Sequence, residues 1–175
     1  MPNREIKPED IIFRKGTAAD LPQIMELAVA VFSGEQEIPE DDVRQAQTDH
    51  TTWWVVACGD RIIGAAAAWE ETDVEEAVLR KAGLMCEHKI AHTARFILDP
   101  AFRGHGLGAR MALYTLREIF RMGYDAIYME NREATVHIVE KYGAVRCGET
   151  VPFYVGTVTP MILTREAFEQ AGCMR

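Results

Sequence analysis

Eight consecutive residues in the second half of the chain have the types and spacing needed to hold an anion. Residues 103–110 have the sequence Arg-Gly-His-Gly-Leu-Gly-Ala-Arg and lead into apolar residues at helical spacing. A helix N-terminus leaves backbone N–H groups without helical partners and carries a partial positive charge, so it favours phosphates. Glycines let a ligand approach those amides, and Arg103 adds a forked cationic donor. The segment therefore predicts a turn that holds a pyrophosphate.

The glycine turn also fits two alternative roles. Gly104, Gly106 and Ala109 satisfy the dinucleotide pattern G-x-G-x-x-G/A, and Asp125 follows at a suitable distance. That pattern belongs directly after a strand of an extended parallel sheet, whereas residues 100–103 intervene here and too little chain follows. The second alternative is a helix cap without a ligand. Three glycines lower helix propensity without improving packing, so we favour a ligand.

The elements around the turn follow from apolar periodicity and from helix and turn signals. A strand is expected over residues 90–99, ending before Pro100, followed by a helix from about Gly104 to Met122 that Gly123 closes. The elements expected before it are a strand at 11–16, a helix from Thr17 or Asp20 to Ser33-Gly34, a β-hairpin within 51–69 and a short helix at 74–82. Those expected after it are a strand at 125–130, a helix at 132–143 and strands at 144–149 and 156–164.

This order mixes hairpins with β-α-β crossovers, which predicts an α/β or α+β fold. The sheet should be mixed, with six to seven strands and helices on both faces. The 175 residues show no linker or internal repeat, so residues 1–175 are expected to form a single domain.

Composition narrows the functional class. The chain is 48% hydrophobic and 26% charged, with a net charge of −8, which argues against a nucleic-acid partner. It has neither a long apolar run nor a signal-peptide pattern, so we expect no membrane partner and a cytoplasmic location. The four cysteines are scattered, as reduced thiols would be. Cys86, His88 and His92 could ligate zinc, but a fourth ligand is not evident, and no metal is predicted.

The segment ILDPAFRGHGLGARMALYTL resembles the motif of the GNAT acyltransferase superfamily. That motif has a strand ending near V-x-P, then Arg/Gln-x-x-Gly-x-Gly/Ala at the start of a helix. Arg103, Gly106 and Gly108 fall on its defined positions. The resemblance extends over nearly the whole chain, from the first helix at residues 16–28, through the hairpin at 56–68, to residues 140–144 and the closing strand at 160–163.

The resemblance implies an N-acetyltransferase that transfers an acetyl or other acyl group from acetyl-CoA to a primary amine. The amine, of a small molecule or a peptide, would attack the thioester directly in a ternary complex. The turn would bind the coenzyme A pyrophosphate through Arg103 and backbone N–H groups of Gly104, His105, Gly106, Leu107, Gly108 and Ala109. The pantetheine arm would pair near Phe96, Ile97 and Leu98, with Asn131 as a further cofactor-binding candidate. The family also allows a homodimer.

A narrower resemblance lies in VFSGEQEIP at residues 31–39. It is similar to a V-F-x-x-E-Q-x-[VI]-P signature in a branch that includes relatives of acyl-homoserine-lactone synthases. This implies a longer acyl chain as an alternative, delivered by acyl carrier protein. Glu35 and Glu37 lie in this segment, in the loop that lines the acceptor site in the family. They would favour a cationic acceptor, unless the loop is simply solvated.

Proton transfer is the remaining chemical requirement, because an ammonium must lose its proton before it attacks. His92, on the strand before the turn, is the candidate base, with a purely structural histidine as the alternative. Many relatives place a tyrosine acid four residues before the glycine that ends the fourth helix, but here that position is Val139. Tyr142 and Tyr154 are the remaining candidate acids, each with a packing role as the alternative, and His105 and His137 are weaker candidates. Because no tyrosine occupies the usual position of the acid, the alternative is a non-catalytic acyl-CoA-binding or regulatory module.

Overall fold

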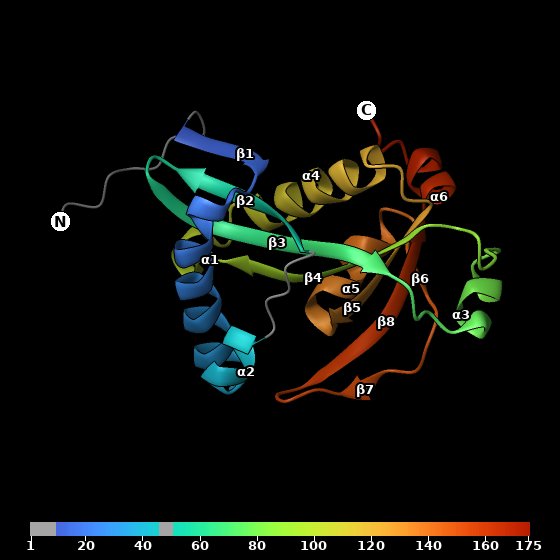
Figure 1. Cartoon of the computed structure of the whole chain (residues 1–175), viewed down its shortest axis with the longest axis horizontal. Helices are drawn as coiled ribbons and strands as arrows, with labels where there is room; N and C mark the ends of the chain where they lie inside the picture. The colour runs from blue at the N-terminus through green and yellow to red at the C-terminus, as the bar shows by residue number, and fades with distance from the viewer. Residues whose placement is uncertain (1–9, 46–50) are drawn as a thin grey trace. The chain divides into compact units, whose positions relative to one another are not determined.

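The computed structural model describes residues 10–45 and 51–175 (Figure 1). Within these residues eight strands pair in the order β1-β2-β3-β4-β5-β8-β6, and β7 pairs with β8. The pair β4 and β5 is parallel, whereas β1 with β2 and β5 with β8 are antiparallel. The predicted mixed α/β fold is therefore confirmed. The prediction of six to seven strands was slightly low, and β7, only two residues long, was not predicted.

The strands and helices have the following bounds. The strands are β1 Ile11–Lys15, β2 Thr52–Cys58, β3 Arg61–Glu71, β4 Ile90–Leu98, β5 Ala126–Arg132, β6 Val145–Arg146, β7 Val151–Pro152 and β8 Thr157–Thr164. The α-helices are α1 Leu21–Ala28, α2 Glu40–Gln45, α3 Glu76–Lys81, α4 Leu107–Arg121, α5 Glu133–Glu140 and α6 Arg165–Gln170. The chain also has the 3₁₀ turns η2 Ala18–Asp20 and η4 Pro100–Phe102 and the π-helical turn η3 Val29–Ser33.

The chain forms two compact units. The first comprises residues 1–67 and 95–112, and the second comprises residues 68–94 and 113–175. Strands β3 and β4 and helix α4 contribute residues to both units. The single domain expected for residues 1–175 stays a prediction.

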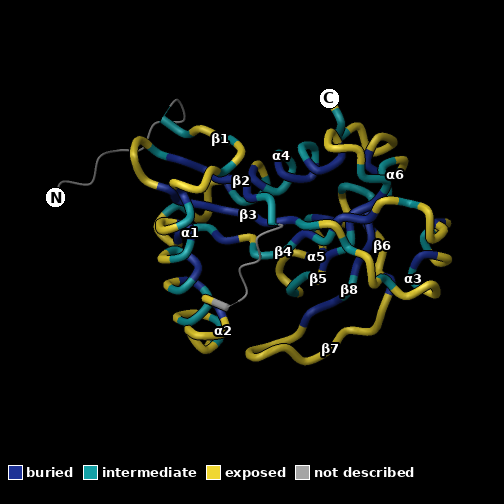
Figure 2. Tube along the Cα trace, viewed as in Figure 1, coloured by how far each residue is buried: buried dark blue, intermediate teal, exposed yellow. Residues whose placement is uncertain are grey.

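The first unit is built around β2 and β3. Residues 53–57 of β2 are buried one after another, which requires cover on both faces of the strand (Figure 2). The run Ala65–Ala68 is a strand, as predicted, although alanine favours helices. At Gly64, an added Cβ would lie 3.0 Å from the Met111 sulfur and 3.2 Å from the Ile97 carbonyl oxygen. The start of α4 therefore packs against β3 more closely than a larger residue would allow.

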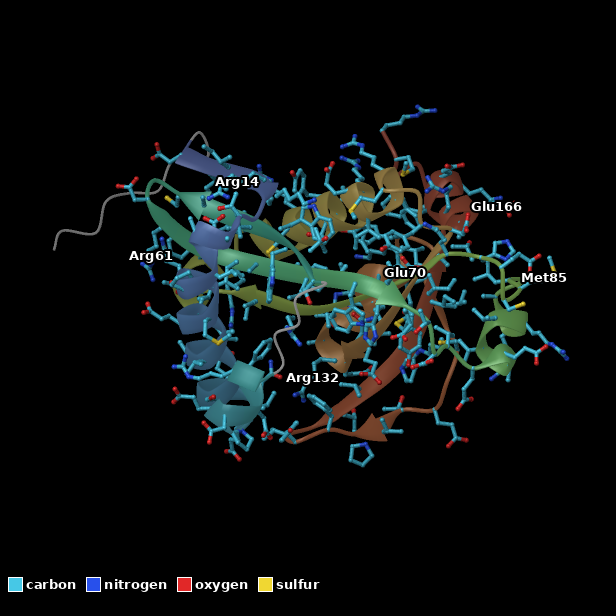
Figure 3. All side chains as sticks on the ribbon, viewed as in Figure 1. Arg14, Arg61, Glu70, Met85, Arg132 and Glu166 are labelled. Atoms are coloured by element: carbon cyan, nitrogen blue, oxygen red, sulfur yellow. The ribbon has the colours of Figure 1, made fainter. Side chains whose placement is uncertain are left out.

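The first helix begins with a capping box at η2. Asp20 accepts hydrogen bonds from Thr17 N–H at 2.7 Å and from Thr17 Oγ1 at 2.9 Å. Arg14, labelled in Figure 3, binds both carboxylate oxygens of Asp20, each at 2.7 Å. The helix starts where the sequence predicted, but its last turn is the π-helix η3. No residue type marks an i→i+5 turn, so the sequence did not predict it.

The second unit has its core on β5 and β8. These strands pair from Ala126 with Thr164 to Arg132 with Val158. On one face of the sheet, Leu79 of α3 packs in a cluster with Ile90, Ala126 and Ile162. The ring of Phe120 in α4 lies 5.1 Å from that of Phe168 in α6. Helix α6 was not predicted; Thr164 caps it by accepting a hydrogen bond from Ala167 N–H at 3.2 Å.

The helix predicted from about Gly104 begins three residues later, at Leu107. Gly104 and Gly106 have φ values of 85° and 72°, in the left-handed region that helical residues do not occupy. The glycines therefore form a turn in front of the helix. The strand expected at 144–149 is shortened to the two residues of β6.

Candidate cofactor turn and proton-transfer site

The glycine turn presents an open row of backbone amides. A Cβ added at Gly104 or Gly106 would meet no atom within 4 Å, and one at Gly108 would meet only Leu98 Cδ2, at 3.8 Å. The α-helical ladder begins with Arg110 N–H donating to Gly106 O at 3.1 Å. The N–H groups of Leu107 and Gly108 precede that bond, at the positive end of a fifteen-residue helix. These residues fit a diphosphate group.

Arg103 is anchored beside these amides. Its Nε and Nη2 donate to the Leu98 carbonyl at 3.1 and 3.0 Å, and its Nη1 donates to Glu35 Oε2 at 2.7 Å. Asp99, next to Leu98, accepts from Ala101 N–H at 2.9 Å and pairs with Arg61 (labelled in Figure 3). The turn is therefore fixed to the end of β4 on both sides of η4. His105 is exposed, with Nδ1 2.9 Å from Arg103 O.

Glu35 reaches Arg103 because the chain after η3 folds back on itself. The carbonyl of Phe32 accepts from Gln36 N–H at 3.1 Å and from Ile38 N–H at 3.2 Å, while Glu37 has a left-handed φ of 53°. Glu35 is thus placed at the predicted cofactor turn, while Glu37 is exposed. The role of both residues in acceptor binding stays a prediction.

The predicted pantetheine strand is the last part of β4. Its pairing with β5 runs from Ile90 with Ala126 to Thr93 with Met129, and two residues later Arg95 has a left-handed φ of 57°. Arg95 lies over the ring of Trp53 at 5.8 Å, and burial lowers the pKa of its guanidinium. Beyond it, Ile97 is fully buried and Phe96 is partly exposed. The backbone of this segment is therefore the part that a pantetheine arm could use.

The candidate base His92 lies among three side chains of the second unit. Its Nδ1 is 2.8 Å from Glu71 Oε2, and both side chains are largely buried. The imidazole is stacked at 4.5 Å on the ring of Trp69 with a 33° tilt, and it meets Tyr128 edge-on at 5.1 Å. Glu71 directly follows Glu70, which is labelled in Figure 3 near the end of β3. Neither Glu71 nor Tyr128 was singled out from the sequence.

Two pKa shifts define the charge of this cluster. Burial acts to raise the pKa of Glu71, but hydrogen bonds from Asp73 N–H and His92 outweigh it, and the pKa is lowered overall. Burial, reinforced by the charge of Glu130, raises the pKa of Tyr128 to about 12. At neutral pH Glu71 is therefore a carboxylate and Tyr128 a neutral phenol.

The two candidate acids lie in different surroundings. Tyr142 is half-buried with its ring 6.3 Å from that of Phe168, and burial raises the pKa of its hydroxyl. Tyr154 is 56% exposed in the β7–β8 loop, with its ring 4.9 Å from that of Phe153. Arg132, labelled in Figure 3, holds this loop by donating to the Val155 carbonyl and by lying 5.1 Å from the Phe153 ring. A catalytic role for either tyrosine stays a prediction.

Asn131, near the end of β5, has a buried side-chain N–H group without a hydrogen-bond partner among the described residues. Its Oδ1 accepts from Thr135 Oγ1 at 3.4 Å, but its Nδ2 is buried without a hydrogen-bond partner among the described residues. A buried donor of this kind is costly unless a ligand completes it. A role for Asn131 in cofactor binding stays a prediction.

The three side chains weighed as zinc ligands are directed to different partners. His88 Nδ1 accepts from Met85 N–H at 3.0 Å, Cys86 Sγ is 3.8 Å from Glu87, and His92 contacts Glu71. In residues 10–45 and 51–175, no three His, Cys, Asp or Glu side chains are grouped as metal ligands would be. Over the same residues, no helix has the length and apolar character to cross a bilayer.

The chain belongs to the acetyltransferase (GNAT) family, whose family model matches residues 21–144. The sequence resemblance is thus confirmed, and the protein has an acyltransferase fold. The match includes the glycine turn, the Glu71–His92 pair and most of the second unit.

Solved structures show the same fold at low sequence identity. Escherichia coli ElaA is 18% identical with a TM-score of 0.70, covering 87% of this chain and 98% of ElaA. FeeM, an N-acyl amino acid synthase from uncultured soil microbes, is 14% identical with a TM-score of 0.71, covering 92% and 94%. The CoA-dependent acyl-homoserine lactone synthase BjaI, solved with SAM and isopentyl-CoA, is 12% identical with a TM-score of 0.73, covering 92% and 87%. No curated protein matches the sequence.

Proposed function

We propose that this protein transfers an acetyl or longer acyl group from acyl-CoA to the primary amine of a small molecule or peptide. The observation that carries the proposal is the open turn at Gly104 and Gly106, where exposed glycines, helix amides and Arg103 come together. The family match and the structure of BjaI with isopentyl-CoA support the same donor class.

The chain's own groups would bind the donor in two ways. Arg103 and the amides of residues 104–109 would hold the diphosphate, and the backbone of Phe96, Ile97 and Leu98 would pair with the pantetheine arm. Asn131 is a further cofactor-binding candidate, because its buried Nδ2 has no hydrogen-bond partner among the described residues. When bound, the donor supplies an activated thioester and a thiolate leaving group.

His92 would take the proton from the attacking ammonium. A histidine is suited to this role because its neutral ring offers one nitrogen lone pair near neutral pH. Tyr154 or Tyr142 would return a proton to the departing thiolate. Tyr154 is the more accessible of the two, since the Tyr142 ring packs on Phe168.

The first experiment measures thermal stability with acetyl-CoA, longer acyl-CoAs, free coenzyme A and NAD. A ligand at about 100 times its dissociation constant stabilises the folded state by about 2.7 kcal/mol, which is several degrees for a protein of this size. An acyl-CoA should raise the melting temperature and NAD should not. Release of free coenzyme A on addition of amines then separates an enzyme from a non-catalytic acyl-CoA-binding module.

Gly106→Glu is the variant that tests whether the turn binds coenzyme A. Its side chain would enter the open space beside the amides and place a negative charge there, so coenzyme A should no longer stabilise the protein. Gly59→Glu is the control, since Gly59 has a similar φ of 59° in the β2–β3 turn and also lies in open space. Unchanged coenzyme A affinity in a folded Gly106→Glu protein would rule out the turn as the binding site.

A further inference from the structure

Glu71 uses both carboxylate oxygens in a fixed arrangement with its neighbours. Oε2 lies 2.8 Å from His92 Nδ1, while Oε1 accepts a hydrogen bond from Asp73 N–H at 3.1 Å. The side chains of His92 and Glu71 are only 15% and 20% exposed. Exposed ion pairs exchange with water and contribute little, whereas this pair is shielded and joined to the backbone.

The charge of Glu71 determines which nitrogen of His92 carries the proton. An ionised carboxylate accepts hydrogen bonds and cannot donate them. The 2.8 Å contact therefore requires hydrogen on Nδ1, which leaves the lone pair of the neutral ring on Nε2. Residue types alone do not make this assignment, because either nitrogen of a histidine can carry the proton.

The remaining neighbours hold the ring and keep its surroundings negative. Trp69 stacks on the imidazole and Tyr128 meets it edge-on, so the ring cannot rotate without losing both contacts. The charged or titratable groups acting on Tyr128 are Glu130, Cys147, Glu71 and Glu75. Three of these groups are carboxylates, and Glu71 is the one that contacts His92 directly.

From this geometry we infer that Glu71 is a positioning residue that holds His92 with Nε2 as the proton acceptor. The inference rests on the proposed function. In the step it serves, the N–H bond of the acceptor ammonium breaks and the proton moves to Nε2. The nitrogen keeps the electron pair with which it attacks the thioester, and the resulting imidazolium stays paired with Glu71 through Nδ1–H.

Glu71→Gln tests this arrangement without removing the side chain. The glutamine Oε1 can still accept from Asp73 N–H, which turns its NH₂ group toward His92 Nδ1. An NH₂ group donates, so Nδ1 must then offer its lone pair and the ring proton must move to Nε2. The variant should therefore fold but hold the wrong tautomer. Glu75→Gln is the control, because Glu75 is exposed in the same segment and contributes the same charge.

Two readouts are needed, one of which does not depend on activity. Nitrogen-15 NMR of labelled histidine at pH 8 should show hydrogen on Nδ1 of His92 in the wild-type and Glu75→Gln proteins, and on Nε2 in Glu71→Gln. In steady-state acylation of an amine, Glu71→Gln should lower kcat at least about tenfold and leave the KM for acyl-CoA unchanged, since loss of a positioned base typically costs about 10²–10⁴-fold. Glu71→Asp should recover part of the rate if a carboxylate is what matters.

Each contradicting result identifies which claim is wrong. Hydrogen on Nε2 in the wild-type protein, or the same tautomer in Glu71→Gln, overturns the assignment to Glu71. An inverted tautomer with unchanged kcat overturns its part in the reaction. Coenzyme A binding without turnover of any amine, with Nδ1 protonated as expected, counts against the proposed function and leaves the role of Glu71 in orienting His92 standing.

Discussion

At the scale of single residues, the contact between Glu35 and Arg103 has a consequence for cofactor affinity. Glu35 Oε2 lies 2.7 Å from Arg103 Nη1, which is one of the donors that a diphosphate would use. Both side chains are about two-fifths exposed, so the pair can exchange with solvent and with an incoming anion. If Arg103 binds the diphosphate as proposed, Glu35 would compete with the cofactor for this donor and favour its release.

Glu35→Gln should raise the affinity for coenzyme A by up to about fivefold, because exposed ion pairs contribute about 0.2–1 kcal/mol. Isothermal titration calorimetry at fixed ionic strength measures the change. Glu37→Gln is the matched control: it removes the same charge two residues away, from a side chain that is exposed. Weaker binding in Glu35→Gln alone would mean that Glu35 orients Arg103 for the ligand instead of competing with it.

At the scale of elements, the start of α1 depends on a single carboxylate. Asp20 caps the turn through Thr17 and binds Arg14 with both oxygens. The hydrogen bonds from Arg14, followed by those from Thr17, hold the pKa of Asp20 well below its usual range despite burial. A group whose pKa is lowered on folding stabilises the folded state above its unfolded pKa of about 3.9, and this stabilisation is lost as the pH falls below that value.

Asp20→Asn should lower the free energy of unfolding by about 1–3 kcal/mol at pH 7, since hydrogen bonds to a charged group contribute about that much. Urea unfolding at pH 7 and pH 3 provides the measurement. The difference between wild type and variant should shrink at pH 3, where Asp20 of the unfolded chain is protonated. Asp60→Asn, in the exposed β2–β3 turn, should change little at either pH. An equal difference at both pH values would contradict the charge-based explanation.

The elements that the sequence predicted well are those with local signals. The glycine turn, the β2–β3 hairpin around Cys58–Arg61 and the strand β4 follow from turn residues and apolar runs. The start of α4 was misplaced because Gly104 and Gly106 have positive φ, which composition does not reveal. The contact of Glu71 with His92 joins residues 21 positions apart and depends on how β3 lies beside β4. Sequence spacing carries no such information.

At the scale of the whole molecule, the two units share three elements. Strands β3 and β4 and helix α4 each continue from one unit into the other, so neither unit holds these elements complete without the other. If residues 1–175 form the single domain that the sequence predicts, the chain should unfold in one cooperative step.

Trp69→Phe provides the test, because the two remaining tryptophans, Trp53 and Trp54, both lie in the first unit. Urea unfolding of this variant followed by tryptophan fluorescence should coincide with unfolding followed by far-ultraviolet circular dichroism, which reports both units. Separate midpoints would show that the two units unfold independently and that the chain holds two domains.

The stacking of Trp69 on His92 gives the protein an intrinsic optical probe. The indole and imidazole rings lie 4.5 Å apart, close enough for electron transfer from an excited indole to a protonated imidazole, which quenches indole emission. The charge on the candidate base can therefore be followed as a change in light intensity, without any label. Comparison with the Trp69→Phe protein isolates this signal from the emission of Trp53 and Trp54. Stopped-flow recording would then time proton arrival at His92 within a single turnover.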